Sequence, residues 1–192
     1  RDLVRSRGLG DVYKRQMYGY ATPVSSLVGP GVFGYDAAPT ANLYDVKKAK
    51  SLLSEAGYAD GFEMSIWVQS SDQIRQEACV IIQSMLEEVG ITVTVEPMDG
   101  TVMDDTIVKG GDFAACSSMY YNLMGDADYV LYSNISPEST SNLSHYSSEA
   151  AMEKLLAARS LTDDAARAAV YAEISAIMAQ DRPYIPLWAY QN

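Results

Sequence analysis

The chain has 192 residues and a formal net charge of −11, a length that can bury one substantial core. Residues 1–16 hold five of the 14 basic residues and two of the 25 acidic ones, so the remainder carries a net charge of −14. This acidic body argues against nucleic acid or an anionic membrane surface as a partner, because both require lysine and arginine to neutralise phosphate. No apolar run approaches the ~18 residues of a membrane-spanning helix.

The first 43 residues divide into two segments. Residues 1–16 show neither a helical nor a strand period, and their charge balance opposes that of the rest. They resemble translated cloning or adapter sequence and lack the apolar core of a signal peptide, so we predict a non-native segment that contributes nothing to the fold. Residues 17–43 concentrate glycine and proline between Pro23 and Gly34 and predict an ordered surface connector.

The stretch from Tyr44 to Glu96 predicts a compact helix, strand, helix, strand unit. Asp45 is a candidate cap for the start of the first helix, and Gly57 for its end. The first strand is expected over 62–68, with Trp67 on the face opposite the apolar one. The second helix, 72–89, precedes a β-branched strand over 91–95, so the two strands should run parallel with a right-handed crossover. The apolar stripe expected on the second helix is Ile74, Ala78, Ile81, Met85 and Val89.

The second half of the chain predicts a third strand and three more helices. Asp99 or Thr101 is a candidate cap for the first of these helices, and Pro183 should end the last one. The expected elements are a helix over 98–109, a strand over 112–121, a polar aromatic loop over 122–144, a helix from Ser147 or Ser148 to Arg159, a helix from Thr162 or Asp163 to about Gln180, and an extended segment over 183–190.

The residue types that most often carry catalysis do not assemble into a motif. His145 is the only histidine, and Cys79 and Cys116 lack the spacing of a metal or redox site, so no metal and no cofactor are expected. Two reduced, buried thiols are favoured over a disulfide. Ser70 and Ser71 follow a strand, but the sequence places no base to activate them, which gives no support to a hydrolytic triad.

Asp126 and Asp128, in the GDADY stretch, leave three interpretations open. The composition is that of an ordinary turn. The two carboxylates and the neighbouring tyrosines also suit recognition of a ligand or partner. Finally, a pair of carboxylates can act as general acid and base, which keeps a small secreted hydrolase as the alternative function.

Several of these stretches, taken in order, resemble a known family. The letters YDVKKAKSLLSEAGYADGF, IIQSMLEEVGI, GDF, GDADYVLY and AQDRPYIPLWAYQN are similar to those of the extracellular solute-binding proteins, family 5, of peptide and nickel ABC importers. The similarity runs from about Tyr18 to Asn192. It implies an α/β fold of the periplasmic-binding-protein-like type II class, namely a C-terminal lobe with a mixed sheet and flanking helices.

The resemblance also implies an organisation and a function. Residues 44–182 would form one lobe of a two-lobed protein that closes on its ligand, and 183–192 would begin the strand returning to the N-terminal lobe, which is missing from this fragment together with signal and anchor. The expected role is a monomeric, extracytoplasmic binding component without catalysis. Its partners would be a peptide or peptide-like solute and the permease subunits of an ABC importer.

The family's ligand contacts transfer only in part. Tyr120 stands where peptide binders have tryptophan, and Leu123 stands where they have the aspartate that holds the ligand ammonium group. The GDADY, IWVQSS and PMDG stretches look more like the branch that includes glutathione binders. Because ligands of α/β sheets bind at the carboxyl ends of strands, the expected ligand-binding residues are Trp67, Gln69, Ser70, Ser71, Arg75, Tyr120, Tyr121, Asn122, Asp126, Asp128 and Tyr129.

Two points stay open at this stage. Arg75 either pairs bidentately with a ligand carboxylate or is a solvated helix residue. A structural or interaction domain would be favoured over a binder if the surface around Trp67 and Tyr120 proved fully packed.

Overall fold

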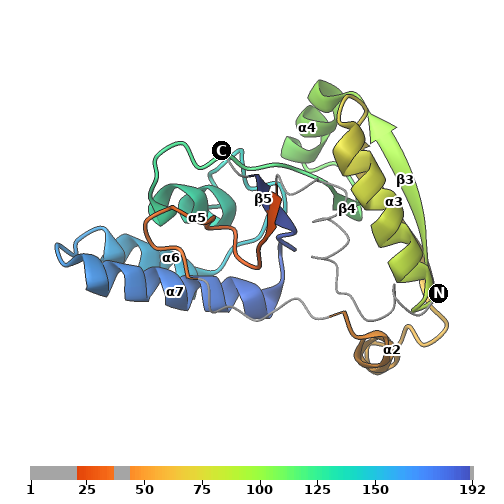
Figure 1. Ribbon diagram of the computed structural model, residues 1–192, viewed down its shortest axis with the longest axis horizontal. Helices are drawn as coiled ribbons and strands as arrows, with labels where there is room; N and C mark the ends of the chain where they lie inside the picture. The colour runs from red at the N-terminus through yellow and green to blue at the C-terminus, as the bar shows by residue number, and fades with distance from the viewer. Residues whose placement is uncertain (1–20, 37–43, 191–192) are drawn as a thin grey trace. The chain divides into compact units, whose positions relative to one another are not determined.

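The computed structural model describes residues 21–36 and 44–190, which form two compact units (Figure 1). One unit comprises residues 44–119, and the other combines the described N-terminal residues with residues 120–190. The boundary between the two units falls at Tyr120, and the assignment of 44–182 to one lobe stays a prediction. The non-native segment expected over 1–16 lies outside the described residues. No helix in the two described ranges is both long and apolar enough to cross a membrane.

The unit of residues 44–119 is built on a parallel sheet of strand order β3-β2-β4. β2 (Phe62–Gln69) pairs with β3 (Ile91–Met98) along its whole length, from Phe62 opposite Ile91 to Gln69 opposite Met98. This confirms the predicted parallel pair. The register places the carboxyl ends of both strands at one edge, where the chain leaves β2 for α3 (Gln73–Glu87) and β3 for α4 (Gly100–Val108).

The predicted caps of this unit are confirmed. Asp45 caps α2 (Val46–Glu55) through a bond from the Lys48 N–H, and Gly57 follows the helix with a φ of 87°. Asp99, one of the two predicted candidates, caps α4 by accepting from two backbone N–H groups, and Asp72, for which no cap was predicted, caps α3. These carboxylates satisfy donors that a helix leaves unpaired at its start.

Two predictions for this unit were wrong in detail. The strand expected over 112–121 shrinks to β4 (Ala115–Cys116), which pairs with β2 at Ile66 and Trp67. Ala78 and Val89 of the predicted stripe are buried, but Ile74 is 45% exposed, and the buried face of α3 also carries Arg75, Cys79, Ile82 and Leu86. The helix is turned because Arg75 finds three acceptors on the packed side, which local periodicity cannot reveal.

The other unit packs three helices around one apolar core. α5 (Ala127–Ile135), α6 (Glu149–Ala158) and α7 (Asp164–Asp181) bury Leu131, Leu155, Tyr171 and Ile174 completely or nearly so. Figure 1 shows α6 and α7 lying side by side. Both α6 and α7 were predicted, and of the two candidate starts given for each, Ser148 and Asp163 are the observed caps.

The loop predicted over 122–144 was wrong, because it contains α5. Asp126 caps this helix by accepting from the Asp128 N–H, so the GDAD stretch is a helix start, not a turn. The predicted connector contains β1 (Ala21–Pro23), which pairs antiparallel with β5 (Trp188–Tyr190). The α/β class with a sheet and flanking helices is confirmed, with parallel and antiparallel pairs in separate sheets.

Candidate ligand-binding site

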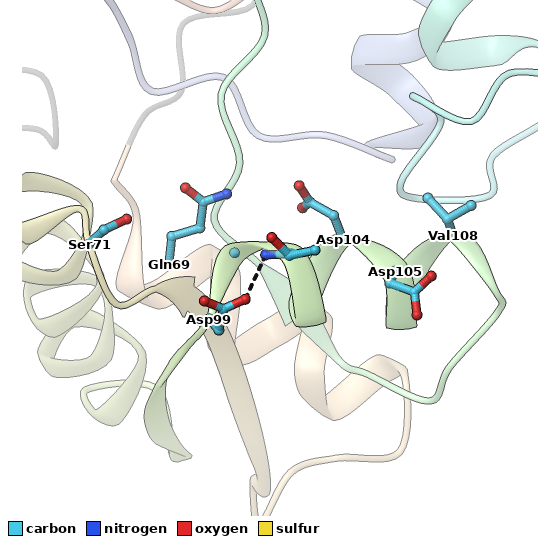
Figure 2. A pocket seen from close by; sticks show the side chains of 8 residues that line it. Gln69, Ser71, Asp99, Asp104, Asp105 and Val108 are labelled. Carbon is cyan, nitrogen blue, oxygen red and sulfur yellow. Dashed lines mark hydrogen bonds between the residues drawn. The ribbon is translucent and has the colours of Figure 1, made fainter.

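An open cavity of about 620 Å³ lies at the carboxyl ends of β2 and β3 (Figure 2). Gln69 ends β2 and Ser71 follows it, while the other lining residues belong to α4 and to its cap, Asp99. This edge is where open α/β sheets bind their ligands, because strands end there and helices begin. The lining residues are Gln69, Ser71, Asp99, Gly100, Thr101, Asp104, Asp105 and Val108.

The three carboxylates of the cavity differ in the hydrogen bonds and ion pairs that they make within the protein. Asp99 Oδ1 accepts from the N–H groups of Thr101 and Val102, at 3.0 and 3.2 Å. Asp105 Oδ2 lies 2.6 Å from Lys109 Nζ. The Asp104 carboxylate, by contrast, makes no hydrogen bond or ion pair with any residue in the described ranges. Asp104 is therefore the carboxylate that can accept a bond from a ligand ammonium or N–H group.

Arg75 is bonded to Gln69 of the cavity wall and is only 5% exposed. Its Nε donates to Asp72 Oδ2 at 2.8 Å, Nη1 to the Ser117 carbonyl at 3.0 Å and Nη2 to Gln69 Oε1 at 2.9 Å. Burial opposes ionisation of Asp72, but the bonds from Arg75 outweigh it and hold the pKa of this carboxyl below its usual value. The interpretation of Arg75 as a solvated helix residue was wrong, and its guanidinium already has protein acceptors.

Asp126 and Asp128 are both paired with arginines. Arg167 Nη2 lies 2.6 Å from Asp126 Oδ2. Arg159 donates to both oxygens of Asp128, at 2.8 and 2.9 Å, and its guanidinium lies over the Tyr132 ring. The bond to Asp128 raises the pKa of Arg159. These contacts give each carboxylate a role within the fold.

The predicted aromatic residues have mixed surroundings. Trp67 lies on the face of β2 opposite Val68 and packs against Phe113, with ring centroids 5.6 Å apart. Tyr120 packs edge-on against Tyr184 and donates to the Ser141 carbonyl. Tyr121 and Tyr129 are both exposed, at 65% and 36%.

Two further residues predicted to bind the ligand, Asn122 and Ser70, make hydrogen bonds within the protein. Asn122 bonds within its own loop, to the Gly125 N–H and the Asp126 carbonyl. Ser70 is bound through its backbone to Met98 and Gln76. Of the residues predicted from the sequence, the structure thus brings Gln69 and Ser71 together in the cavity and leaves the others elsewhere.

The α4 side of the cavity was missed by sequence reasoning. The signal that could have found it is the rule already applied to the first strand, because the second parallel strand must end at the same edge. Residues 98–101 therefore had to lie beside Gln69 once the parallel pair was predicted. Within the described residues, no cluster of three or more histidine, cysteine or acidic side chains is arranged to hold a metal ion.

A parallel α/β unit with a ligand-sized cavity at its strand ends defines a class of small-molecule binding folds. The family model for bacterial extracellular solute-binding proteins, family 5 Middle, matches residues 11–142. The chain belongs to this family, as the resemblance implied.

Individual relatives agree with this assignment. The glutathione-binding protein GsiB of Escherichia coli (strain K12) is 30% identical over 177 residues, which are 88% of this chain and 34% of that protein. The chain thus spans about a third of the length of the curated relatives it matches.

Solved structures share the fold. The ABC transporter-associated periplasmic binding protein DppA from Helicobacter pylori, in complex with the peptide STSA, superimposes with a TM-score of 0.83 at 28% identity. That match covers 94% of this chain and 36% of DppA. HbpA2 from Haemophilus parasuis gives a TM-score of 0.87 at 26% identity, over 94% of this chain and 37% of HbpA2. The predicted periplasmic-binding-protein-like type II fold is confirmed.

Proposed function

We propose that this chain is part of an extracytoplasmic solute-binding protein that delivers a peptide or peptide-like solute to the permease of an ABC importer. The names of its relatives, which include glutathione-binding and peptide-bound proteins, support this substrate class. The protein works as a monomer in the periplasm or as a cell-surface lipoprotein, and it binds its solute without chemical conversion.

The observation that carries the proposal is the cavity at the ends of β2 and β3, with Asp104 in its wall. The carboxylate of Asp104 faces the cavity in Figure 2 and has no ion-pair partner within the described ranges. An amino or amide N–H group of a peptide-like solute is the complementary donor. The hydrolase alternative finds no support, because Asp126 and Asp128 are engaged by Arg167 and Arg159 and the relatives are solute-binding proteins.

A titration followed by nuclear magnetic resonance tests the proposal. The ¹⁵N-labelled chain is titrated with glutathione and, separately, with the tetrapeptide STSA, up to the millimolar range. We expect saturable shifts at the backbone amides of Gly100, Thr101 and Val108. Absence of shifts at all cavity residues with both probes contradicts the proposal.

A matched pair of variants identifies the anchor. Asp104→Asn and Asp105→Asn remove the same charge from adjacent positions of α4, and only Asp105 is held by Lys109. A charge-assisted hydrogen bond contributes about 1.5–3 kcal/mol, so Asp104→Asn should weaken binding by roughly ten- to a hundredfold. Asp105→Asn should change it by less than about threefold, the effect of an exposed surface charge. Equal effects of the two variants would remove Asp104 from its assigned role.

A further inference from the structure

The side chain of Gln69 is held in one orientation. Its Oε1 accepts from Arg75 Nη2 at 2.9 Å, and Arg75 is itself fixed by Asp72 and the Ser117 carbonyl. A guanidinium has donors only, so it selects the oxygen of the amide and turns Nε2 to the other side. The buried arginine therefore decides which end of the Gln69 amide reaches the cavity.

Gly100 makes room for this orientation. A Cβ atom built at Gly100 would lie 2.9 Å from Gln69 Nε2 and 3.0 Å from its Cδ, closer than side chains pack. Figure 2 shows the amide nitrogen of Gln69 on the side of Asp104, with the oxygen on the side of Ser71. The glycine at the start of α4 thus lets the amide extend along the cavity wall.

The Nε2 group has hydrogens to donate. Gln69 lines the cavity, and its Nε2 makes no hydrogen bond to another residue in the ranges 21–36 and 44–190. The acceptor that it takes from a ligand has to tolerate the negative wall formed by Asp99, Asp104 and Asp105. A ligand carboxylate would be repelled by these charges, whereas a neutral carbonyl oxygen would not.

We propose that Gln69 donates a hydrogen bond from Nε2 to a neutral carbonyl oxygen of the bound solute, and that Arg75 is the positioning residue that presents this donor. The inference rests on the proposed function and adds a requirement to it. A peptide or amide group, with a carbonyl oxygen next to an N–H, meets Gln69 and Asp104 together. The site therefore reads a peptide unit and not an isolated carboxylate.

The Gln69→Glu variant separates this role from a structural one. Glutamate keeps the oxygen that accepts from Arg75 and replaces the donor by a second, negatively charged oxygen beside the guanidinium, so the melting temperature should stay within about 2 °C of the parent. Affinity for glutathione and for STSA should fall at least about tenfold, because a donor is replaced by a charged acceptor. Gln73→Glu is the control, since it adds the same charge at an exposed position of α3 outside the cavity.

The positioning role is read from Arg75→Lys together with the side-chain resonances. Lysine keeps the charge but cannot reach Asp72, Ser117 and Gln69 at once. The side-chain Nε2 resonances of Gln69 should shift when either probe binds to the parent. Arg75→Lys should lower the affinity for both probes. Gln69→Glu, which should remain folded, provides a second measure of the same donor.

The outcomes distinguish the two proposals. If backbone amides of the cavity shift but the Gln69 side chain does not, or if Gln69→Glu binds as tightly as the parent, the inference is overturned and the proposed function stands. If no cavity residue responds to either probe, the proposed function fails and this inference fails with it.

Discussion

Arg167 joins the start of α5 to α7 by donating to Asp126 Oδ2 at 2.6 Å and to the Tyr171 hydroxyl at 3.1 Å. The bond with Tyr171 and then that with Asp126 raise the pKa of Arg167. Asp126 has a second task, because its other oxygen caps α5. The same carboxylate thus begins one helix and holds another, which explains why the GDAD stretch carries two acidic residues.

Replacing Asp126 should therefore reduce stability. Asp126→Ala removes both the cap and the ion pair, and we expect it to lower the free energy of unfolding by about 1–3 kcal/mol. Asp126→Asn keeps a good cap and should lose less than about 1 kcal/mol, the size of a partly exposed ion pair. Urea unfolding followed by circular dichroism measures both. Similar losses in the two variants would mean that the cap contributes little.

Sequence reasoning located helices where a cap and an apolar period coincide, and it failed where a polar residue is buried. From the sequence, Arg75 stays open between a ligand contact and a solvated helix residue, because its acceptors, Gln69 and the Ser117 carbonyl, lie six and 42 residues away in the chain. No local period records such contacts. α5 was missed for a related reason, since its cap follows Gly125 and mimics a turn.

The ligand site shows the same division. The carboxyl end of β2 could be assigned from topology, and Gln69 and Ser71 do line the cavity. The ion pairs of Asp128 and Asp126 could not be predicted, because the arginines that form them follow in the chain by 31 and 41 residues. Charged residues in the sequence are candidates for binding a ligand, but only the fold shows which of these charges are already paired within the protein.

Arg75→Met should be among the most destabilising substitutions in the chain. The variant removes a side chain that is 5% exposed and leaves Asp72, Gln69 and the Ser117 carbonyl without their donor. Breaking a buried pair on one side costs about 3–5 kcal/mol, and this loss should appear in the urea midpoint. The control is Lys109→Met, which breaks an exposed pair with Asp105 and should cost at most about 0.5 kcal/mol. A loss of the control's size at Arg75 would contradict its structural role.

Gly61 and Gly57 provide a test of backbone packing. Both have positive φ, 77° and 87°, so alanine is strained at either position. A Cβ at Gly61 would lie only 1.8 Å from the Gly90 carbonyl oxygen, whereas nothing lies within 4 Å of one at Gly57. Gly57→Ala should cost about 1–2 kcal/mol and Gly61→Ala at least about 1 kcal/mol more, measured by thermal unfolding. Equal costs would show that the Gly61 and Gly90 segments separate easily.

Cys116 should react slowly with alkylating reagents despite its partial exposure. Burial, followed by the negative charge of Asp104, raises the pKa of its thiol from 9.0 to about 11. Because the thiolate is the nucleophile, a pKa of about 11 in place of 9.0 lowers the thiolate fraction at pH 8 about a hundredfold. Alkylation with iodoacetamide, quantified by mass spectrometry of the Cys116 peptide, should therefore rise with pH up to about 11.

Between pH 9 and 11 the folded protein keeps the Cys116 proton whereas the unfolded chain loses it, so the free energy of unfolding should fall over this range. Asp104→Asn should raise the alkylation rate at pH 8, because it removes one of the charges that oppose the thiolate. A rate equal to that of an exposed thiol in the parent would mean that the Cys116 side chain is neither buried nor close to Asp104.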